Sequence, residues 1–164
     1  MQVAIISDVH DNLENLKISL AWINKNKISN LICCGDLTNS ETLQFLADNF
    51  LGDIYLVKGN GILFKEEEVK KFKNIKYFGQ VGRFKLGDKF VGLCHEPFLR
   101  DRVLDLGACD IIFYGHTHKP WEEVFKGVRS VNPGTLGALF SKGSFALWDM
   151  ESDEIELKVL GINT

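Results

Sequence analysis

The sequence has no excess of positive charge, no long apolar run and no internal repeat. Its 164 residues include 19 lysines and arginines against 22 aspartates and glutamates, a formal net charge of −3. This balance offers no general attraction to nucleic acid or anionic lipid, so neither a nucleic-acid polymer nor a membrane is expected as a partner. No stretch approaches the roughly 18 apolar residues that a membrane helix needs. Without a linker or low-complexity stretch, a single domain over residues 1–164 is expected.

The N-terminal segment and the cysteines favour a cytoplasmic protein. Residues 1–8 reach a charged side chain too early for a secretory signal. The cysteines lie inside apolar runs without forming a C-x-x-C pair, and they are Cys33, Cys34, Cys94 and Cys109. Free buried thiols in a reducing compartment fit this distribution better than a thiolate metal site.

The first half of the chain alternates short apolar runs with helical patterns. Strands are predicted at 3–6, 31–34 and 54–57. Between them, one helix is predicted from a capping box at Asp11 and Glu14 to about Asn26, and another from a cap at Ser40. This order predicts parallel strands with right-handed crossovers, and chemistry then gathers beyond the carboxyl ends of the strands.

The second half indicates antiparallel pairs. Hairpins are predicted across Gly87-Asp88 and Gly127, and a closing pair is predicted from 145–148 and 155–160. A helix at 98–106 and a strand at 110–114 are predicted between the two hairpins. The charged segment 65–73 is expected to be a solvated helix or loop.

All four histidines follow predicted strands, and so do three further oxygen-bearing side chains. The set comprises Asp8, His10, Asp36, Asn60, His95, His116 and His118. One such histidine alone would more often be a satisfied polar residue, but four at strand exits indicate a site. Imidazole and carboxylate without thiolate favour Mn²⁺, Fe²⁺, Ni²⁺ or Zn²⁺. Seven ligands are too many for one catalytic metal with an open position, and they suit two metals that share a carboxylate.

Five short motifs carry a family resemblance. They are Asp8-Val9-His10, Gly35-Asp36, Gly59-Asn60, Cys94-His95 and Gly115-His116-Thr117-His118. In this order the chain resembles the calcineurin-like metallophosphoesterases. The turn Val131-Asn132-Pro133-Gly134-Thr135 resembles the small, single-domain YfcE-like phosphodiesterase branch of that family. The resemblance implies a four-layer α/β/β/α sandwich of two mixed sheets flanked by helices.

The resemblance also implies roles for the seven residues. Asp8, His10 and His118 would bind one divalent ion. Asn60, His95 and His116 would bind the other, with Asp36 bridging them. The two ions would be Mn²⁺ or Ni²⁺ first, with Fe²⁺ or Zn²⁺ as alternatives. A hydroxide between them would attack phosphorus in a small phosphorylated compound, most readily a phosphodiester, so that Asp36, Asn60 and His95 act in catalysis through that hydroxide.

Two departures from the family pattern concern substrate handling. Many relatives follow Gly-Asn with a histidine that protonates the leaving group, where this chain has Gly61-Ile62. With all four histidines assigned as ligands, the hypothesis is a preference for good leaving groups. In addition, His95-Glu96-Pro97 replaces the family's frequent His-Gly-His.

The alternative to an enzyme is a catalytically weak scaffold on the same fold, like the retromer subunit that resembles this branch. Retention of all seven ligands favours the enzyme. Specificity is expected from segments 61–82 and 96–107. Lys119 could contact phosphate, but an exposed lysine without a role is the favoured interpretation. Arg100 and Arg102 could lie near the site or simply on a surface helix. The oligomeric state stays open, and a homodimer or higher homo-oligomer is compatible with the sequence.

Overall fold

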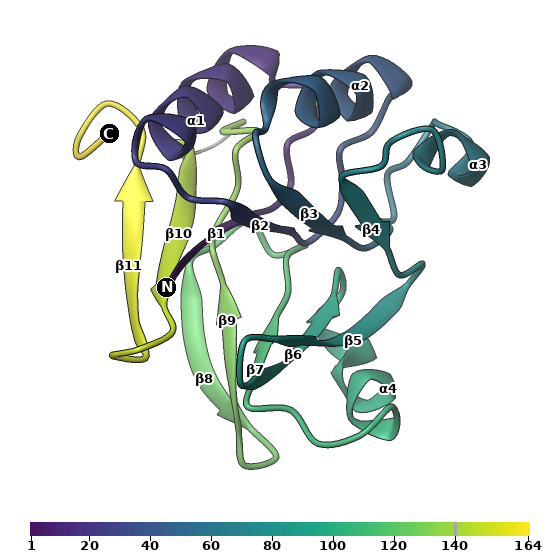
Figure 1. Cartoon of the computed structure of the whole chain (residues 1–164), viewed down its shortest axis with the longest axis vertical. Coiled ribbons are helices and arrows are strands. Elements are labelled where there is room, and N and C mark those ends of the chain that lie inside the picture. Colours follow the sequence, from purple (N-terminus) through teal and green to yellow (C-terminus); the bar gives the residue numbers. More distant parts are fainter. Residues whose placement is uncertain (140) are drawn as a thin grey trace.

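Two mixed sheets are stacked face to face in the computed structural model, which describes residues 1–139 and 141–164 (Figure 1). The first sheet contains, in spatial order, β11 (Glu154–Val159), β10 (Ser144–Asp149), β1 (Gln2–Ile6), β2 (Asn30–Cys33), β3 (Asp53–Leu56) and β4 (Ile75–Tyr77). The second contains β5 (Val81–Leu86), β6 (Lys89–Cys94), β7 (Ile111–Phe113), β9 (Val128–Asn132) and β8 (Trp121–Phe125). The helices are α1 (Leu13–Lys25), α2 (Ser40–Asn49), α3 (Glu66–Val69) and α4 (Arg100–Asp105).

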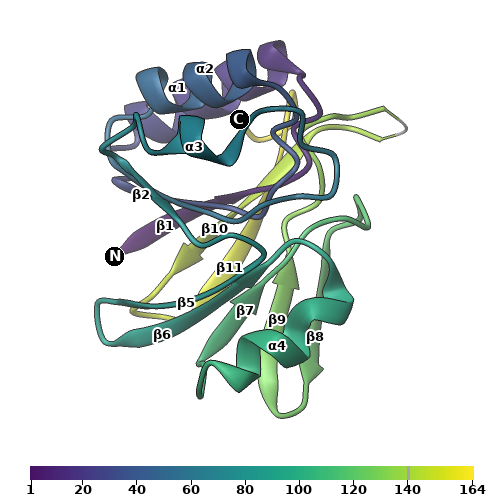
Figure 2. The same ribbon diagram turned by 90° about the vertical axis from the view of Figure 1, so that its right-hand side faces the viewer.

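Alternation along the central strands builds three apolar layers. On β1, Ala4 and Ile6 pack under α1 and α2, whereas Val3 and Ile5 pack between the two sheets. On the second sheet, Ile112 faces the other way and packs in the layer that contains Val103 of α4. Figure 2 shows the resulting order of helices, sheet, sheet and helix. The predicted four-layer α/β/β/α sandwich is therefore confirmed.

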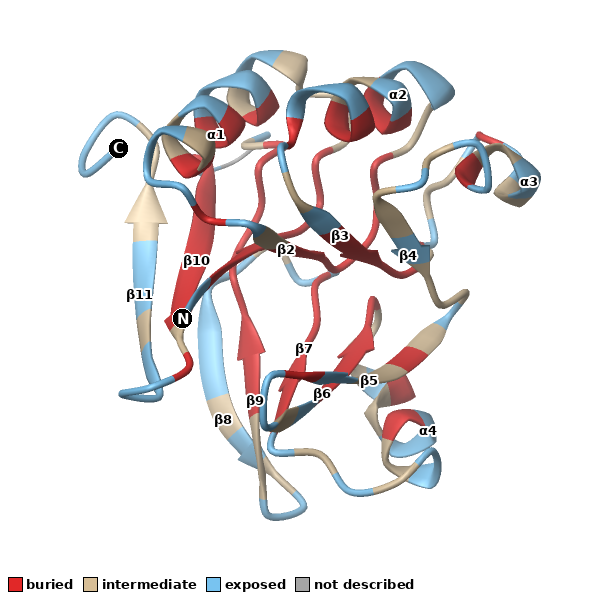
Figure 3. Cartoon of the chain, viewed as in Figure 1, coloured by how far each residue is buried: buried red, intermediate tan, exposed pale blue. Residues whose placement is uncertain are grey.

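Parallel pairing brings many strand ends to one edge of the molecule. The strands β1, β2, β3 and β4 are mutually parallel, and so are β6, β7 and β9. The remaining pairs, β1 with β10, β10 with β11, β5 with β6 and β8 with β9, are antiparallel. The centre of each sheet is buried, whereas the edge strand β8 is largely exposed (Figure 3). The loops after the parallel strands are thus free to carry polar groups.

The predicted helix starts are each off by one residue. Helix α1 is capped by Asn12, whose side chain accepts a hydrogen bond from the Asn15 N–H at 3.0 Å. The carboxylate of Asp11 instead accepts one from the Thr42 hydroxyl at 2.7 Å. Asn39, and not Ser40, caps α2. Neighbouring polar residues can each act as the N-cap of a helix, so the sequence does not fix which of them does so.

Three further differences concern short elements. The predicted helix at 98–106 begins as a 3-10 turn, Pro97–Leu99, and becomes α-helical only at Arg100. Within 65–73 only the single turn α3 is helical. The three-residue strand β4 was not predicted, because so short an apolar pattern carries little signal. Among the described residues, no helix is both long and apolar enough to span a membrane.

Candidate metal centre

The seven predicted ligands all follow strands whose carboxyl ends face the same edge. Asp8 and His10 follow β1, Asp36 follows β2, and Asn60 follows β3. From the second sheet, His95 follows β6, and His116 and His118 follow β7. Both sheets therefore contribute to one cluster, and the structure brings together all seven residues that the sequence singled out.

The first part of the cluster contains Asp8, His10 and His118. The Nε2 atoms of the two histidines lie 3.0 Å apart. His118 Nε2 is 3.2 Å, and His10 Nε2 3.7 Å, from Oδ1 of Asp8. Two ligands about 2.1 Å from one cation lie about 3 Å from each other when they subtend a right angle. The spacing of these three groups is therefore compatible with one shared ion.

The second part contains Asn60, His95 and His116. Asn60 Oδ1 lies 2.8 Å from His95 Nε2 and 2.9 Å from His116 Nδ1. The other ring nitrogen of His95, Nδ1, contacts the Cys34 carbonyl oxygen at 2.7 Å. Since a carbonyl can only accept, Nδ1 is the donor in this contact, and Nε2 faces the cluster.

Asp36 lies between the two parts. Its Oδ2 atom is 3.3 Å from His95 Nε2 and 3.8 Å from His10 Nε2. Its Oδ1 atom accepts a hydrogen bond from the Gly61 N–H at 2.7 Å. The carboxylate is thereby oriented with one oxygen facing a histidine from each part.

The carboxylates and imidazoles of the cluster tune one another. Burial raises the pKa of Asp36, but the hydrogen bond and charge of His95 and the Gly61 N–H outweigh it, and the pKa is lowered. Burial lowers the pKa of His95, but the bond to Asp36 and the charges of Asp8 and Asp36 outweigh it, and the pKa is raised. The hydrogen bond with Asp8 is the main reason that the pKa of His10 is raised. Asp36 is thus held as a carboxylate beside positive charge.

The glycines of two motifs are explained by close approach to ligand side chains. A Cβ atom on Gly59 would lie 1.9 Å from Oδ1 of Asp36. A Cβ atom on Gly115 would lie 1.9 Å from the Ser7 hydroxyl oxygen and 2.7 Å from Oδ2 of Asp8. Any larger residue would displace the carboxylates. Hence glycine precedes Asn60 and His116 because the backbone there passes against the site.

A buried asparagine anchors the loop that carries His116 and His118. Asn132 is only 2% exposed. Its Nδ2 donates to the Gly115 carbonyl at 2.8 Å and to the Thr117 hydroxyl at 3.0 Å, while its Oδ1 accepts from the Gly134 N–H at 2.8 Å. In the sequence the Asn-Pro-Gly turn stood out only as a family resemblance, and no role was predicted for it. The motif was the signal by which this anchor could have been found.

The chemistry of the cluster suits divalent cations. When the His95 ring is neutral, the atoms that face one another each present a lone pair. They are His95 Nε2, Asn60 Oδ1 and Asp36 Oδ2. Such atoms repel one another unless a proton or a cation lies between them. Two groups, Asp8 with His10 and His118, and Asp8 with Asp36 and His95, each have their ligand atoms within 4.8 Å of one another. The residues present therefore fit divalent metal ions.

The remaining candidates from the sequence lie elsewhere or play structural parts. Arg100 pairs with Glu123 at 2.6 Å and covers the rings of Tyr114 and Phe125. Arg102 donates to Gln80 at 2.9 Å. All four cysteines are free, and three of them are buried. Burial raises the pKa of Cys33 and of Cys94 to about 12, so these thiols stay protonated.

Comparison with known proteins identifies the family. The model of the calcineurin-like phosphoesterase superfamily domain matches residues 1–153. A phosphodiesterase of Methanocaldococcus jannaschii is 23% identical over 98% of this chain and 99% of its own. A solved archaeal phosphodiesterase has a TM-score of 0.85 at 23% identity, covering 98% of this chain and 100% of its own.

Two further solved structures share the fold. Vps29 of Entamoeba histolytica, complexed with Zn²⁺, has a TM-score of 0.70 at 21% identity, covering 100% of this chain and 95% of its own. The phosphoesterase YfcE of E. coli has a TM-score of 0.68 at 18% identity, covering 98% and 100%. The chain belongs to the calcineurin-like phosphoesterase superfamily, which confirms the resemblance and the predicted class of function.

Proposed function

We propose that this single-domain protein is a phosphodiesterase that depends on two divalent metal ions. Asp8, His10 and His118 would hold one ion, and Asn60, His95 and His116 the other, with Asp36 reaching both. When bound, such ions lower the pKa of a water molecule towards neutrality and offset the negative charge of a phosphoryl group. The observation that carries the proposal is the placement of Asp36, whose Oδ2 atom lies within 3.8 Å of histidine nitrogens from both parts.

The surrounding residues would keep the ligands in place during the reaction. The Cys34 carbonyl fixes the tautomer of His95, and the Gly61 N–H orients Asp36. Ser7 donates its hydroxyl to Asp8 at 2.6 Å. For a set of nitrogen and oxygen ligands, Mn²⁺ or Ni²⁺ is proposed first and Fe²⁺ or Zn²⁺ next. The free, buried cysteines support a reducing compartment such as the cytoplasm.

Hydrolysis of bis-p-nitrophenyl phosphate with added Mn²⁺ or Ni²⁺ tests the proposal. Turnover is expected in the wild type, and Asp36→Asn should reduce kcat by about 10³-fold, because metal stabilisation of the transition state is worth several kcal/mol. The exposed carboxylate of Asp105 on α4 provides the matched control, since Asp105→Asn removes the same charge away from the site. No turnover in the metal-loaded wild type, or equal losses in both variants, would contradict the proposal.

The similarity to Vps29 favours a second candidate, a catalytically weak binding protein on the same fold. Because one Vps29 structure is complexed with Zn²⁺, metal binding does not separate the two candidates. Turnover does. A protein that binds metal with full occupancy, leaves the diester intact and captures a protein partner would support the binding protein.

The leaving-group preference is a separate prediction. A well-placed general acid is typically worth about 10²–10⁴ in rate, and no histidine remains for this role when all four bind metal. We therefore expect the protein to hydrolyse aryl diesters faster than alkyl monoesters such as glycerol phosphate. Measuring kcat/KM for both substrates checks this, and equal or faster hydrolysis of the alkyl monoester would refute it.

A further inference from the structure

A hollow of about 320 Å³ adjoins the two histidines of the last motif. Residues 116–119 line it together with Thr135, Leu139 and Ser141. Its volume lies near the lower end of the usual range for sites that bind small molecules. Because His116 and His118 form part of its wall, a molecule with a phosphoryl group at the metal centre could extend directly into it.

The segment that contributes Thr135 and Leu139 is hydrogen-bonded to the backbone of the candidate ligand Asp8. The Thr135 hydroxyl and the Gly137 N–H each donate to the Asp8 carbonyl oxygen at 2.8 Å. The Asn12 side chain donates to the Gly137 carbonyl at 3.1 Å. A Cβ atom on Gly137 would lie 3.2 Å from the ring of His10, so the backbone passes against that ring. The base of the segment that carries Leu139 therefore has a fixed position relative to the ligands.

The chemistry of the wall points to an apolar group. Leu139 is 68% exposed although it follows a buried stretch, 131–137, and it belongs to none of the core clusters that the described residues form. Lys119, which also lines the hollow, is exposed and contributes a positive charge. An apolar side chain beside a phosphate-binding centre can cover a ring, and a nearby lysine attracts the anion as a whole.

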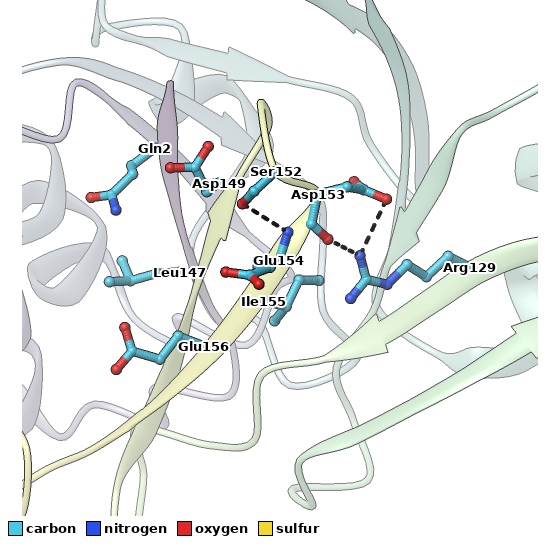
Figure 4. A pocket seen from close by; sticks show the side chains of 9 residues that line it. All are labelled: Gln2, Arg129, Leu147, Asp149, Ser152, Asp153, Glu154, Ile155 and Glu156. Atoms are coloured by element: carbon cyan, nitrogen blue, oxygen red, sulfur yellow. Dashed lines mark hydrogen bonds and ion pairs between the residues drawn. The ribbon is translucent and has the colours of Figure 1, made fainter.

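A second and larger hollow, of about 610 Å³, is unsuited to a phosphoester (Figure 4). Four carboxylates line it: Asp149, Asp153, Glu154 and Glu156. The cation in its lining, Arg129, forms an ion pair with Asp153 and another, of 2.7 Å, with Glu122. An anion there would meet net negative charge, and none of the metal-ligand candidates takes part in the lining.

We propose that the hollow between 116–119 and Leu139 receives the organic group of the phosphoester and selects a flat apolar group, such as an aryl ring or a nucleobase, over a short alkyl group. This inference rests on the proposed function. It assigns specificity to Thr135, Leu139 and Ser141, outside the segments 61–82 and 96–107 expected from the sequence. It also agrees with a preference for good leaving groups, many of which are aromatic.

Binding of two phosphonates tests the selection without turnover, because their carbon–phosphorus bond is not hydrolysed. Isothermal titration of Mn²⁺-loaded protein should show phenylphosphonate binding about tenfold more tightly than methylphosphonate, as expected from partial burial of a phenyl ring. Leu139→Ala should reduce this ratio to about threefold. The control is Leu51→Ala, since Leu51 is 81% exposed and lies just before β3, at the opposite end of the strand from Asn60.

A variant that fills the hollow tests the inferred selection independently. Ser141→Trp should weaken phenylphosphonate to the level of methylphosphonate while leaving the latter unchanged, because only the ring needs the hollow. If the wild type binds both ligands equally and still hydrolyses the diester, the inferred selection of a ring is wrong while the proposed function stands. If neither phosphonate binds and the diester is not hydrolysed, the proposed function fails and the inference fails with it.

Discussion

The backbone at the metal-ligand candidates adopts a conformation that non-glycine residues rarely take. Five of the seven have positive φ angles: Asp8 (52°), His10 (45°), Asp36 (52°), His116 (70°) and His118 (59°). Each such residue costs about 1–3 kcal/mol and persists only when the surrounding structure demands it. Strain of this kind concentrates at functional sites. Here it turns the chain sharply after β1, β2 and β7, so that side chains from separate strands face one another.

Asn132 is predicted to act on metal affinity through the loop that it anchors. Asn132→Ala removes the donors to the Gly115 carbonyl and the Thr117 hydroxyl and frees the loop that carries His116 and His118. Loss of such supporting bonds typically weakens metal binding by about 10–100-fold. Titration of the apoprotein with Mn²⁺ measures the effect.

Asn74→Ala is the matched control for this prediction. Asn74 is partly buried and, like Asn132, donates to a backbone carbonyl, that of Ala47 at 2.9 Å, but it lies away from the candidate ligands. An unchanged Mn²⁺ affinity in Asn132→Ala, or an equal loss in both variants, would show that the anchor does not support the site.

The convergence of the candidate ligands could be predicted from the sequence, whereas the contacts that support these residues could not. His95 and Asp36 could be recognised because each follows a strand-like apolar run, and such exits converge in α/β sheets. The Thr135 hydroxyl, in contrast, bonds a backbone carbonyl 127 positions earlier, at Asp8. A side chain that pairs with a backbone atom leaves no complementary residue type in the sequence. Only the folded chain reveals such a pair.

At the scale of elements, helix α1 is held by one apolar stripe. Its buried residues are Leu16, Ser19, Leu20 and Ile23. Leu16 is fully buried in the layer against the first sheet, whereas Ile18, two positions on, is 45% exposed. Helix packing against the sheet therefore depends on the stripe and not on the hydrophobicity of the helix as a whole.

This stripe gives a direct prediction of stability. Leu16→Ala should lower the free energy of unfolding by about 2–5 kcal/mol, because the buried side chain leaves a cavity. Ile18→Ala should change it by less than about 0.5 kcal/mol, since surface substitutions rarely do more. Urea denaturation followed by circular dichroism measures both. Similar losses in the two variants would show that the assigned face of α1 is wrong.

Element boundaries show where sequence patterns lose resolution. The short apolar run of β1 and the helical spacing of α1 predicted both elements well, because the run is buried on both faces and the helical pattern extends over a whole buried face. Strand β4 has only three residues, and one of them is exposed, so its pattern is too short to recognise. The cap of α2 is Asn39 where the sequence predicted Ser40, because either of these adjacent polar residues could accept the backbone hydrogen bond.

At the scale of the whole molecule, one fact organises the site: the ends of parallel strands from two different sheets meet. β6 and β7 pair in parallel within the second sheet, as β1, β2 and β3 do within the first. Local patterns predicted most of these strands. Their division between two sheets came from the family resemblance, because periodicity does not say which strands pair across long distances.

Anomalous scattering from crystals grown with Mn²⁺ would show whether the seven side chains hold two divalent ions. Two manganese peaks are expected about 3.5–4 Å apart, the usual spacing of a two-metal centre. One peak should contact Asp8, His10 and His118, and the other Asn60, His95 and His116. Asp36 should contact both. A single peak, or manganese bound away from these residues, would contradict the account.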